Sequence, residues 1–154
     1  MEKNFSGANS RILGLIILEV KSLIKDFCPD VIINSAAYTN VDGSETEKEL
    51  SWAINVTGVE NIIKYARACD AHLIHISSDY IFDGENGPYS EQDPVCPISV
   101  YGKTTVQGEG GILEVSPDAL LIRTTVIFGP DAQRKNFVCQ LQDRLREEKV
   151  MKIP

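Results

Sequence analysis

Short apolar runs and helical stripes of apolar residues alternate along the chain. Three runs have the length and character of buried parallel strands; they are Val31 to Asn34, Leu73 to Ser77 and Asp118 to Phe128. Before the first run, Val20, Leu23, Ile24 and Phe27 recur at helical spacing, and Pro29 ends that helix. Between the first two runs, a continuous apolar seam predicts a second helix with a buried face; it is formed by Trp52, Val56, Val59, Ile63 and Ala66.

This order of strands and helices predicts an α/β fold, a partial Rossmann-type parallel sheet with helices on both faces. Ser44 to Glu47 has the form of a capping box, which predicts that Ser44 begins a helix. Glycines 108, 110 and 111 predict that the helix opening with Tyr101 frays or ends near Glu109. Asn136 to Lys149 predicts an exposed amphipathic helix with Phe137, Leu141 and Leu145 turned inward.

Composition excludes several kinds of partner. A net charge of −7 and an isoelectric point near 4.8 give no attraction to nucleic acid or to an anionic membrane. No apolar run is long enough to span a bilayer, and the first residues lack the pattern of a secretory signal. The four cysteines show no CxxC or Cys/His metal spacing. We therefore expect a cytoplasmic protein with reduced thiols and no metal site.

The candidate chemistry lies between His72 and Glu109. The second strand closes with Ser77-Ser78, and a polar loop then leads to the helix that opens with Tyr101. A serine hydroxyl can donate a hydrogen bond to a carbonyl oxygen, and a phenol can give or take a proton there. The two histidines are three residues apart on a strand and point to opposite faces, so we interpret both as structural. The loop NSAAYTNVD follows the first strand at the edge where open α/β sheets bind ligands.

Three segments together resemble the extended short-chain dehydrogenase/reductases, most closely the dTDP-4-dehydrorhamnose reductases; they are "PDVIINSAAYTNVD", "SSDYIFDG" and "YSEQDPVCPISVYGKT". The resemblance runs from about Glu19 to about Val138. It implies reduction of the C4 ketone of a dTDP-4-keto-6-deoxy sugar with NADP or NAD as cofactor. The partner implied is therefore a nucleotide sugar.

The resemblance also implies roles for individual residues. Ser78 would hold the carbonyl oxygen, Tyr101 would supply the proton, and Thr105 stands where the family has a lysine. A free phenol has a pKa of about 10, and the family's lysine favours its ionised form, whereas Thr105 brings no charge. The implied cofactor-binding residues are Ala36, Ala37, Tyr38, Asn55 and Tyr101. The implied substrate-binding residues are Thr39, Val41, Asp42 and Tyr80.

Residues 1–18 resemble the family less well than residues 19–154 do. The family opens with the turn G-x-x-G-x-x-G, and Gly7 to Gly14 looks like a damaged copy of it, with Ser10 at the middle glycine. We expect 1–18 to be a degenerate or irregular segment, with the first βα unit degenerate or missing, and 19–154 to form the Rossmann-type domain. An unrelated leader containing two glycines is the alternative. Family members are about twice as long, so we expect their C-terminal substrate-binding part to be absent.

Two functional hypotheses follow. The first is a dTDP-4-dehydrorhamnose reductase, truncated or variant; the second is a weak or inactive reductase-fold subunit with a binding or regulatory role, like the similar β-subunit of methionine adenosyltransferase. A fragment that neither binds nor catalyses is the third interpretation. An exposed sheet edge would favour a homodimer. The sequence leaves the choice between NAD and NADP open, because the selector after the second strand of the family's fold has no counterpart.

Overall fold

The computed structural model describes residues 19–129 and 136–147. They belong to two units, one ending at Arg123 and one starting at Thr124, and each is described by itself. The N-terminal segment 1–18, predicted to be degenerate or irregular, lies outside the described residues.

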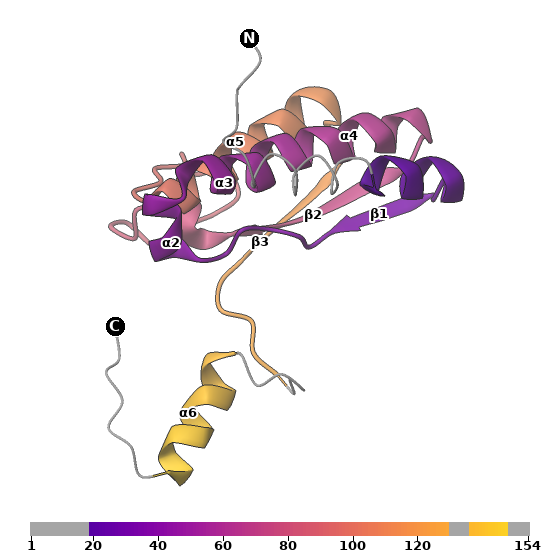
Figure 1. Ribbon diagram of the computed structural model, residues 1–154. Coiled ribbons are helices and arrows are strands. Elements are labelled where there is room, and N and C mark those ends of the chain that lie inside the picture. The colour runs from indigo at the N-terminus through magenta and orange to yellow at the C-terminus, as the bar shows by residue number, and fades with distance from the viewer. Residues whose placement is uncertain (1–18, 130–135, 148–154) are drawn as a thin grey trace. The chain divides into compact units, whose positions relative to one another are not determined.

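A three-stranded parallel sheet forms the centre of the first unit (Figure 1). The strands stand in the order β1 (Val31–Asn34), β2 (His72–Ser78) and β3 (Leu120–Thr124). Val31 lies opposite His72, and Asn34 lies opposite His75. The predicted α/β fold with a parallel Rossmann-type sheet is confirmed. The third strand is shorter than predicted, because its hydrogen-bonded ladder ends at Thr124 and Phe128 lies beyond it.

Helices follow each of the first two strands. A helix over residues 19–27 precedes β1. After β1 come α2 (Val41–Thr46), α3 (Lys48–Trp52), the π-helical segment η1 (Ala53–Gly58) and α4 (Val59–Ala68). After β2 come the single 3₁₀ turn η2 (Asp79–Ile81) and α5 (Val100–Val115). Figure 1 shows α3, α4 and α5 on the same side of the sheet.

The core lies between the sheet and these helices. Val59 and Ile63 of α4, Leu73 of β2 and Ile112 of α5 form its buried cluster, and four half-buried residues pack against it; these are Ile32, Ile62, Ala119 and Leu121. Val56 and Ala66 of the predicted seam are also buried, and Trp52 is half-buried. The seam therefore serves as core, as predicted.

The opposite face of the sheet carries apolar side chains that remain accessible. Val31 and Ile33 of β1 are 50% and 66% exposed, and Leu120 and Ile122 of β3 are 48% and 40% exposed. The helices α3, α4 and α5 supply one of the two covered faces that the sequence predicts; within the first unit, the described residues show no helix on the other face.

The first helix after β1 begins earlier than the capping-box pattern predicted. Asn40 is the N-cap of α2, and its side chain accepts a hydrogen bond from the backbone N–H of Gly43 at 3.0 Å. Ser44 is buried inside the helix and donates to the carbonyl of Val41 at 2.6 Å. The prediction that Ser44 is the cap was wrong, because an asparagine four residues earlier already satisfies the first free N–H groups.

Helix α5 does not end near Glu109 as its glycines predicted, but continues to Val115. Ser99 caps it, accepting from the N–H of Gly102 at 3.0 Å, and Ile112 near its end is fully buried. A Cβ atom on Gly108 would lie 2.4 Å from the carbonyl oxygen of Asn55. Gly108 therefore allows close packing of α5 on η1, and that packing outweighs its low helix propensity.

The described part of the second unit contains α6 (Phe137–Arg146). Asn136 caps it by accepting from the N–H of Cys139 at 3.0 Å. Leu141 is half-buried, but Leu145 is 67% exposed, so the prediction that Leu145 turns inward was wrong. Searched over the described residues alone, the chain has no helix with the length and apolar character needed to cross a membrane.

Candidate functional site

A small pocket opens at the carboxyl ends of β1 and β2, beside the first turns of α5. Its lining residues are Ala36, Ala37, Asn55, Val59, His75, Ile76, Ser77, Tyr101 and Thr105. Its volume of about 20 Å³ is enough for about one water molecule. Five residues to which the resemblance gave cofactor-binding or catalytic roles meet here from three distant segments: the loop after β1, segment η1, and the start of α5.

Asn55 fixes the loop after β1 to the helices. Its side-chain oxygen accepts from the backbone N–H of Tyr38 at 2.8 Å, and its side-chain nitrogen donates to the carbonyl of Tyr38 at 3.2 Å. The same nitrogen donates to the hydroxyl of Thr104 in α5 at 3.1 Å. Asn55 is 5% exposed and sits in the π-helical segment, a feature frequent at functional sites. Its amide thus positions the walls of the pocket.

The end of β1 is held by a second buried amide. The side-chain nitrogen of Asn34 lies 2.9 Å from Nδ1 of His75, and its oxygen accepts from the N–H of Ala36 at 3.1 Å. His75 is 6% exposed, and burial lowers its pKa, although the negative charge of Glu109 acts in the opposite direction. A neutral imidazole that accepts from Asn34 fits the structural role predicted for this histidine.

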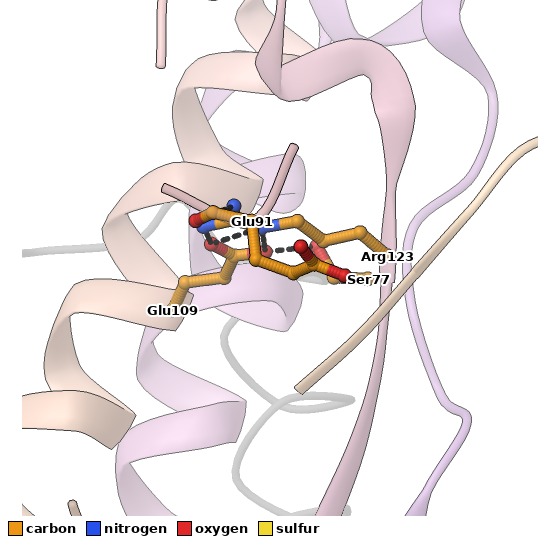
Figure 2. Close-up of polar contacts among 4 residues, drawn as sticks. All are labelled: Ser77, Glu91, Glu109 and Arg123. Carbon is orange, nitrogen blue, oxygen red and sulfur yellow. Dashed lines mark hydrogen bonds and ion pairs between the residues drawn. The ribbon is translucent and has the colours of Figure 1, made fainter. Parts of the chain in front are cut away.

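An ion pair with a buried carboxylate binds Ser77, one of the residues that line the pocket (Figure 2). Glu109 of α5 is 3% exposed, and its carboxylate lies 2.8 Å from a terminal nitrogen of Arg123 in β3. Ser77 at the end of β2 donates to the same carboxylate. Arg123 also donates to the carbonyl of Glu91 at 3.2 Å. The pair therefore joins β2, β3, α5 and the loop before α5.

The sequence interpretation did not find this network. The available signals were a glutamate on a glycine-rich helix and an arginine in a buried strand, where a charge requires a partner. Neither signal says which acid and which base will meet.

Ser78 and Tyr80 form a turn that lies against the start of α5. The Ser78 hydroxyl donates to the Asp79 carboxylate and accepts from the N–H of Tyr80, both at 3.2 Å. A Cβ on Gly102 would lie 2.2 Å from the carbonyl oxygen of Tyr80. The rings of Tyr80 and Tyr101 meet edge to face, with centroids 5.5 Å apart. Tyr80 thus lies against Tyr101, whereas Ser77 rather than Ser78 lines the pocket.

Tyr101 and Thr105 share one face of α5, as their four-residue spacing requires. No hydrogen bond joins the Tyr101 hydroxyl to another residue of the described chain. Thr105 is 8% exposed and donates to the carbonyl of Tyr101 at 2.9 Å. The phenol is therefore open to a ligand, while the threonine hydroxyl is engaged by the backbone of its own helix.

The remaining predicted residues lie outside the pocket lining. Thr39 and Asp42 are exposed, and Val41 is half-buried in the first turn of α2. The Tyr38 hydroxyl donates to the carboxylate of Glu47, and this hydrogen bond, more than burial, raises the pKa of Tyr38. Tyr38 thus reaches the pocket wall only through its backbone contacts with Asn55.

Comparison with known proteins gives one consistent family. The profile of the family described as RmlD substrate binding domain matches residues 16–154. The dTDP-4-dehydrorhamnose reductase of Aggregatibacter actinomycetemcomitans is 42% identical over 111 residues, which cover 71% of this chain and 38% of the relative. Methionine adenosyltransferase 2 subunit beta of Xenopus laevis is 41% identical over 128 residues, covering 81% of this chain and 38% of the relative.

Solved structures agree with this result. A crystal structure of a hypothetical dTDP-4-dehydrorhamnose reductase from Sulfolobus tokodaii superposes with a TM-score of 0.79 at 39% identity, covering 88% of this chain and 47% of the other. The dTDP-4-dehydrorhamnose reductase of Bacillus anthracis in complex with NADP gives 0.79 at 32% identity, covering 87% and 47%. The chain spans less than half the length of these relatives.

Proposed function

Because this chain belongs to the RmlD substrate binding domain family of extended short-chain dehydrogenase/reductases, we propose that it is the cofactor-binding and catalytic part of a reductase. Its substrate would be the C4 ketone of a dTDP-4-keto-6-deoxy sugar, and its cofactor NADPH or NADH. The observation that carries the proposal is the pocket at the carboxyl ends of β1 and β2, where Ala36, Ala37 and Tyr101 meet. Open α/β sheets bind ligands at this edge.

The residues at this edge fit the nicotinamide end of such a cofactor. Ala36 and Ala37 are exposed and carry only methyl groups, so a flat ring can approach the loop backbone closely. The Tyr101 phenol, without a hydrogen-bond partner among the described residues, can reach the ring or the ribose. The cofactor would supply hydride to the ketone carbon. The predicted phosphate-binding turn, Gly7 to Gly14, lies outside the described residues.

The chain's own groups would act on the carbonyl oxygen. Ser78 would donate a hydrogen bond to this oxygen after releasing Asp79, and Tyr101 would give it a proton as the hydride arrives. Asn55, through its contacts with Tyr38 and Thr104, would hold the loop after β1 in a fixed position against α5. Thr105 supplies no positive charge at the family's lysine position, so we expect slow turnover.

Cofactor titration followed by a turnover assay tests this function. NADPH and NADH are titrated into the chain by fluorescence, and ketone reduction is then followed by loss of reduced cofactor. We expect Tyr101→Phe to lower kcat by about 10²-fold or more, the size of a positioned acid, with little change in cofactor affinity. Thr105→Lys should raise kcat, whereas Lys103→Ala, an exposed residue of the same helix, should not change it. Absence of cofactor binding in the wild type and in Thr105→Lys would refute the reductase function.

A second function is a subunit that binds without catalysing. The specific observation is Thr105, buried and bonded to the Tyr101 carbonyl, together with the identity to methionine adenosyltransferase 2 subunit beta. This function predicts a stable complex with a methionine adenosyltransferase catalytic chain in size-exclusion chromatography. The Tyr101→Phe variant should form this complex as the wild type does. A reductase without this partner would show turnover that depends on Tyr101 and no such complex.

A further inference from the structure

Cys28 and Cys69 meet at the ends of two helices. Cys28 follows the helix over residues 19–27, and its backbone N–H donates to the carbonyl of Ile24 at 2.8 Å. Cys69 is the C-cap of α4, and its thiol donates to the same carbonyl at 3.5 Å. Because one oxygen accepts from both residues, the Cys69 sulfur is held beside Cys28, although β1 and the helices from α2 to α4 separate them in the sequence.

The Cys28 side chain also changes the environment of the Cys69 thiol. It is the largest cause of the raised pKa of Cys69, burial adds to it, and the positive charge of Lys25 acts in the opposite direction. Cys28 is exposed and Cys69 is half-buried. A reagent in solution therefore reaches Cys28 first, with the Cys69 thiol held at the same carbonyl that the Cys28 backbone binds.

We propose that Cys28 and Cys69 form a dithiol site that peroxides oxidise to an intramolecular disulfide. The Cys28 thiol takes one oxygen from hydrogen peroxide, giving a sulfenic acid and water. The Cys69 thiol then attacks that sulfur, forming the S–S bond and releasing a second water. Overall, two thiols and one peroxide give one disulfide and two waters. Closure brings the two sulfurs to about 2.05 Å, starting from a fold in which the Cys28 backbone and the Cys69 thiol already bind one carbonyl oxygen.

The bridge would join the end of helix 19–27 to the end of α4 and enclose residues 28–69. This segment contains β1 and Asn55, with the pocket residues Ala36 and Ala37 between them. A covalent ring around it restricts the unfolded chain and so stabilises the fold. We therefore expect the oxidised chain to melt several degrees above the reduced chain, and the gain to disappear when a thiol reductant is added.

Thiol counting and peptide mapping test the site. The reduced, folded chain is treated with hydrogen peroxide, and the remaining thiols are alkylated after unfolding. We expect the chain to lose two of its four free thiols and to lose about 2 Da in mass. The Cys96→Ser variant makes the map unambiguous, because trypsin leaves Cys69 and Cys96 together on the peptide 68–103. In that variant a link between peptides 26–48 and 68–103 can join only Cys28 to Cys69.

Two further experiments test whether the link depends on these two cysteines and on the fold. Cys28→Ser and Cys69→Ser should each abolish the link, with circular dichroism showing that both variants fold. Oxidation in concentrated guanidinium chloride should give a mixture of pairs, because only the fold brings these two thiols together. Full alkylation of Cys28 and Cys69 after peroxide treatment of the folded wild type would overturn the proposal, as would an equal yield of the same link in the denaturant.

Discussion

Glu109 is a buried carboxylate that binds side chains from two different strands, Ser77 of β2 and Arg123 of β3. It accepts from Ser77 and Arg123, and Arg123 in turn binds the carbonyl of Glu91 (Figure 2). A carboxylate that is 3% exposed pays a large desolvation cost, and only its paired partners offset it. Removing one partner should therefore lower the free energy of unfolding more than removing both.

Glu109→Ala should lower the free energy of unfolding by about 3–5 kcal/mol, because Arg123 would remain charged and without its carboxylate. The double variant Glu109→Met, Arg123→Met should lose less than Glu109→Ala alone, since no unpaired charge remains. Urea denaturation followed by circular dichroism measures both. Glu114→Ala, at an exposed position of the same helix, is the control and should change stability by less than about 0.5 kcal/mol. A double variant less stable than Glu109→Ala would contradict this account of the pair.

The candidate site was predictable from the sequence only where spacing determines geometry. The step of four residues from Tyr101 to Thr105 put both on one helix face, and the structure has both lining the pocket. Strand alternation places Ser77 on a buried face but cannot name Glu109 as its partner. The contacts of Asn55 with the Tyr38 backbone were equally inaccessible, because they depend on how a loop folds back on a helix.

Helix α5 illustrates how packing overrides propensity at the scale of an element. Gly108, Gly110 and Gly111 each disfavour a helix, yet α5 runs through all of them. Only Gly108 has a close neighbour at its missing Cβ, the carbonyl oxygen of Asn55 at 2.4 Å; Gly110 and Gly111 have none within 4 Å. The three glycines therefore differ in what they do.

Two alanine substitutions in α5 should have opposite effects. Gly110→Ala should raise the free energy of unfolding by up to about 1 kcal/mol, because it restricts the unfolded chain and meets no obstacle. Gly108→Ala should lower it, because its methyl group would push α5 away from η1. Thermal unfolding of the two variants side by side measures the difference. If both variants were stabilised, the close approach at Asn55 would not matter.

Element types were easier to predict than element ends. Apolar runs and stripes predicted the strands and helices, because periodicity reports which face is buried. The ends depend on local competition. Asn40 caps α2 ahead of Ser44, and Thr124 ends β3 before Phe128, where the ladder of hydrogen bonds stops. A single sequence shows all of these candidates without ranking them.

For the first unit as a whole, stability should depend on pH through His75. Burial lowers its pKa below the ordinary value of 6.5, so the unfolded chain binds a proton that the folded chain resists. Its contribution is complete above pH 6.5 and is lost as the pH falls from there toward the lowered pKa of the folded state. Asn34 and Glu109 face the imidazole; Asn34 is neutral, and the charge of Glu109 reduces the effect without reversing it.

Replacing the two histidines one at a time checks this dependence. His75→Gln should flatten the fall in melting temperature between about pH 6.5 and pH 5, because no group then gains a proton on unfolding in this range. His72→Gln, the same substitution at an exposed histidine, is the matched control and should leave the fall unchanged. The same slope in the wild type and in His75→Gln would exclude His75 as its cause.

The accessible aliphatic side chains of β1 and β3 bear on how this polypeptide behaves in a test tube. Val31, Ile33, Leu120 and Ile122 alternate with the core residues Ile32 and Leu121 and therefore stand on the side of the sheet away from the core. A solvent-exposed apolar surface of this kind binds fluorescent dyes such as anilinonaphthalene sulfonate and promotes aggregation. Dilute solutions of the protein should therefore show no turbidity. Turbidity should appear when the protein is concentrated and disappear when a mild non-ionic detergent is added.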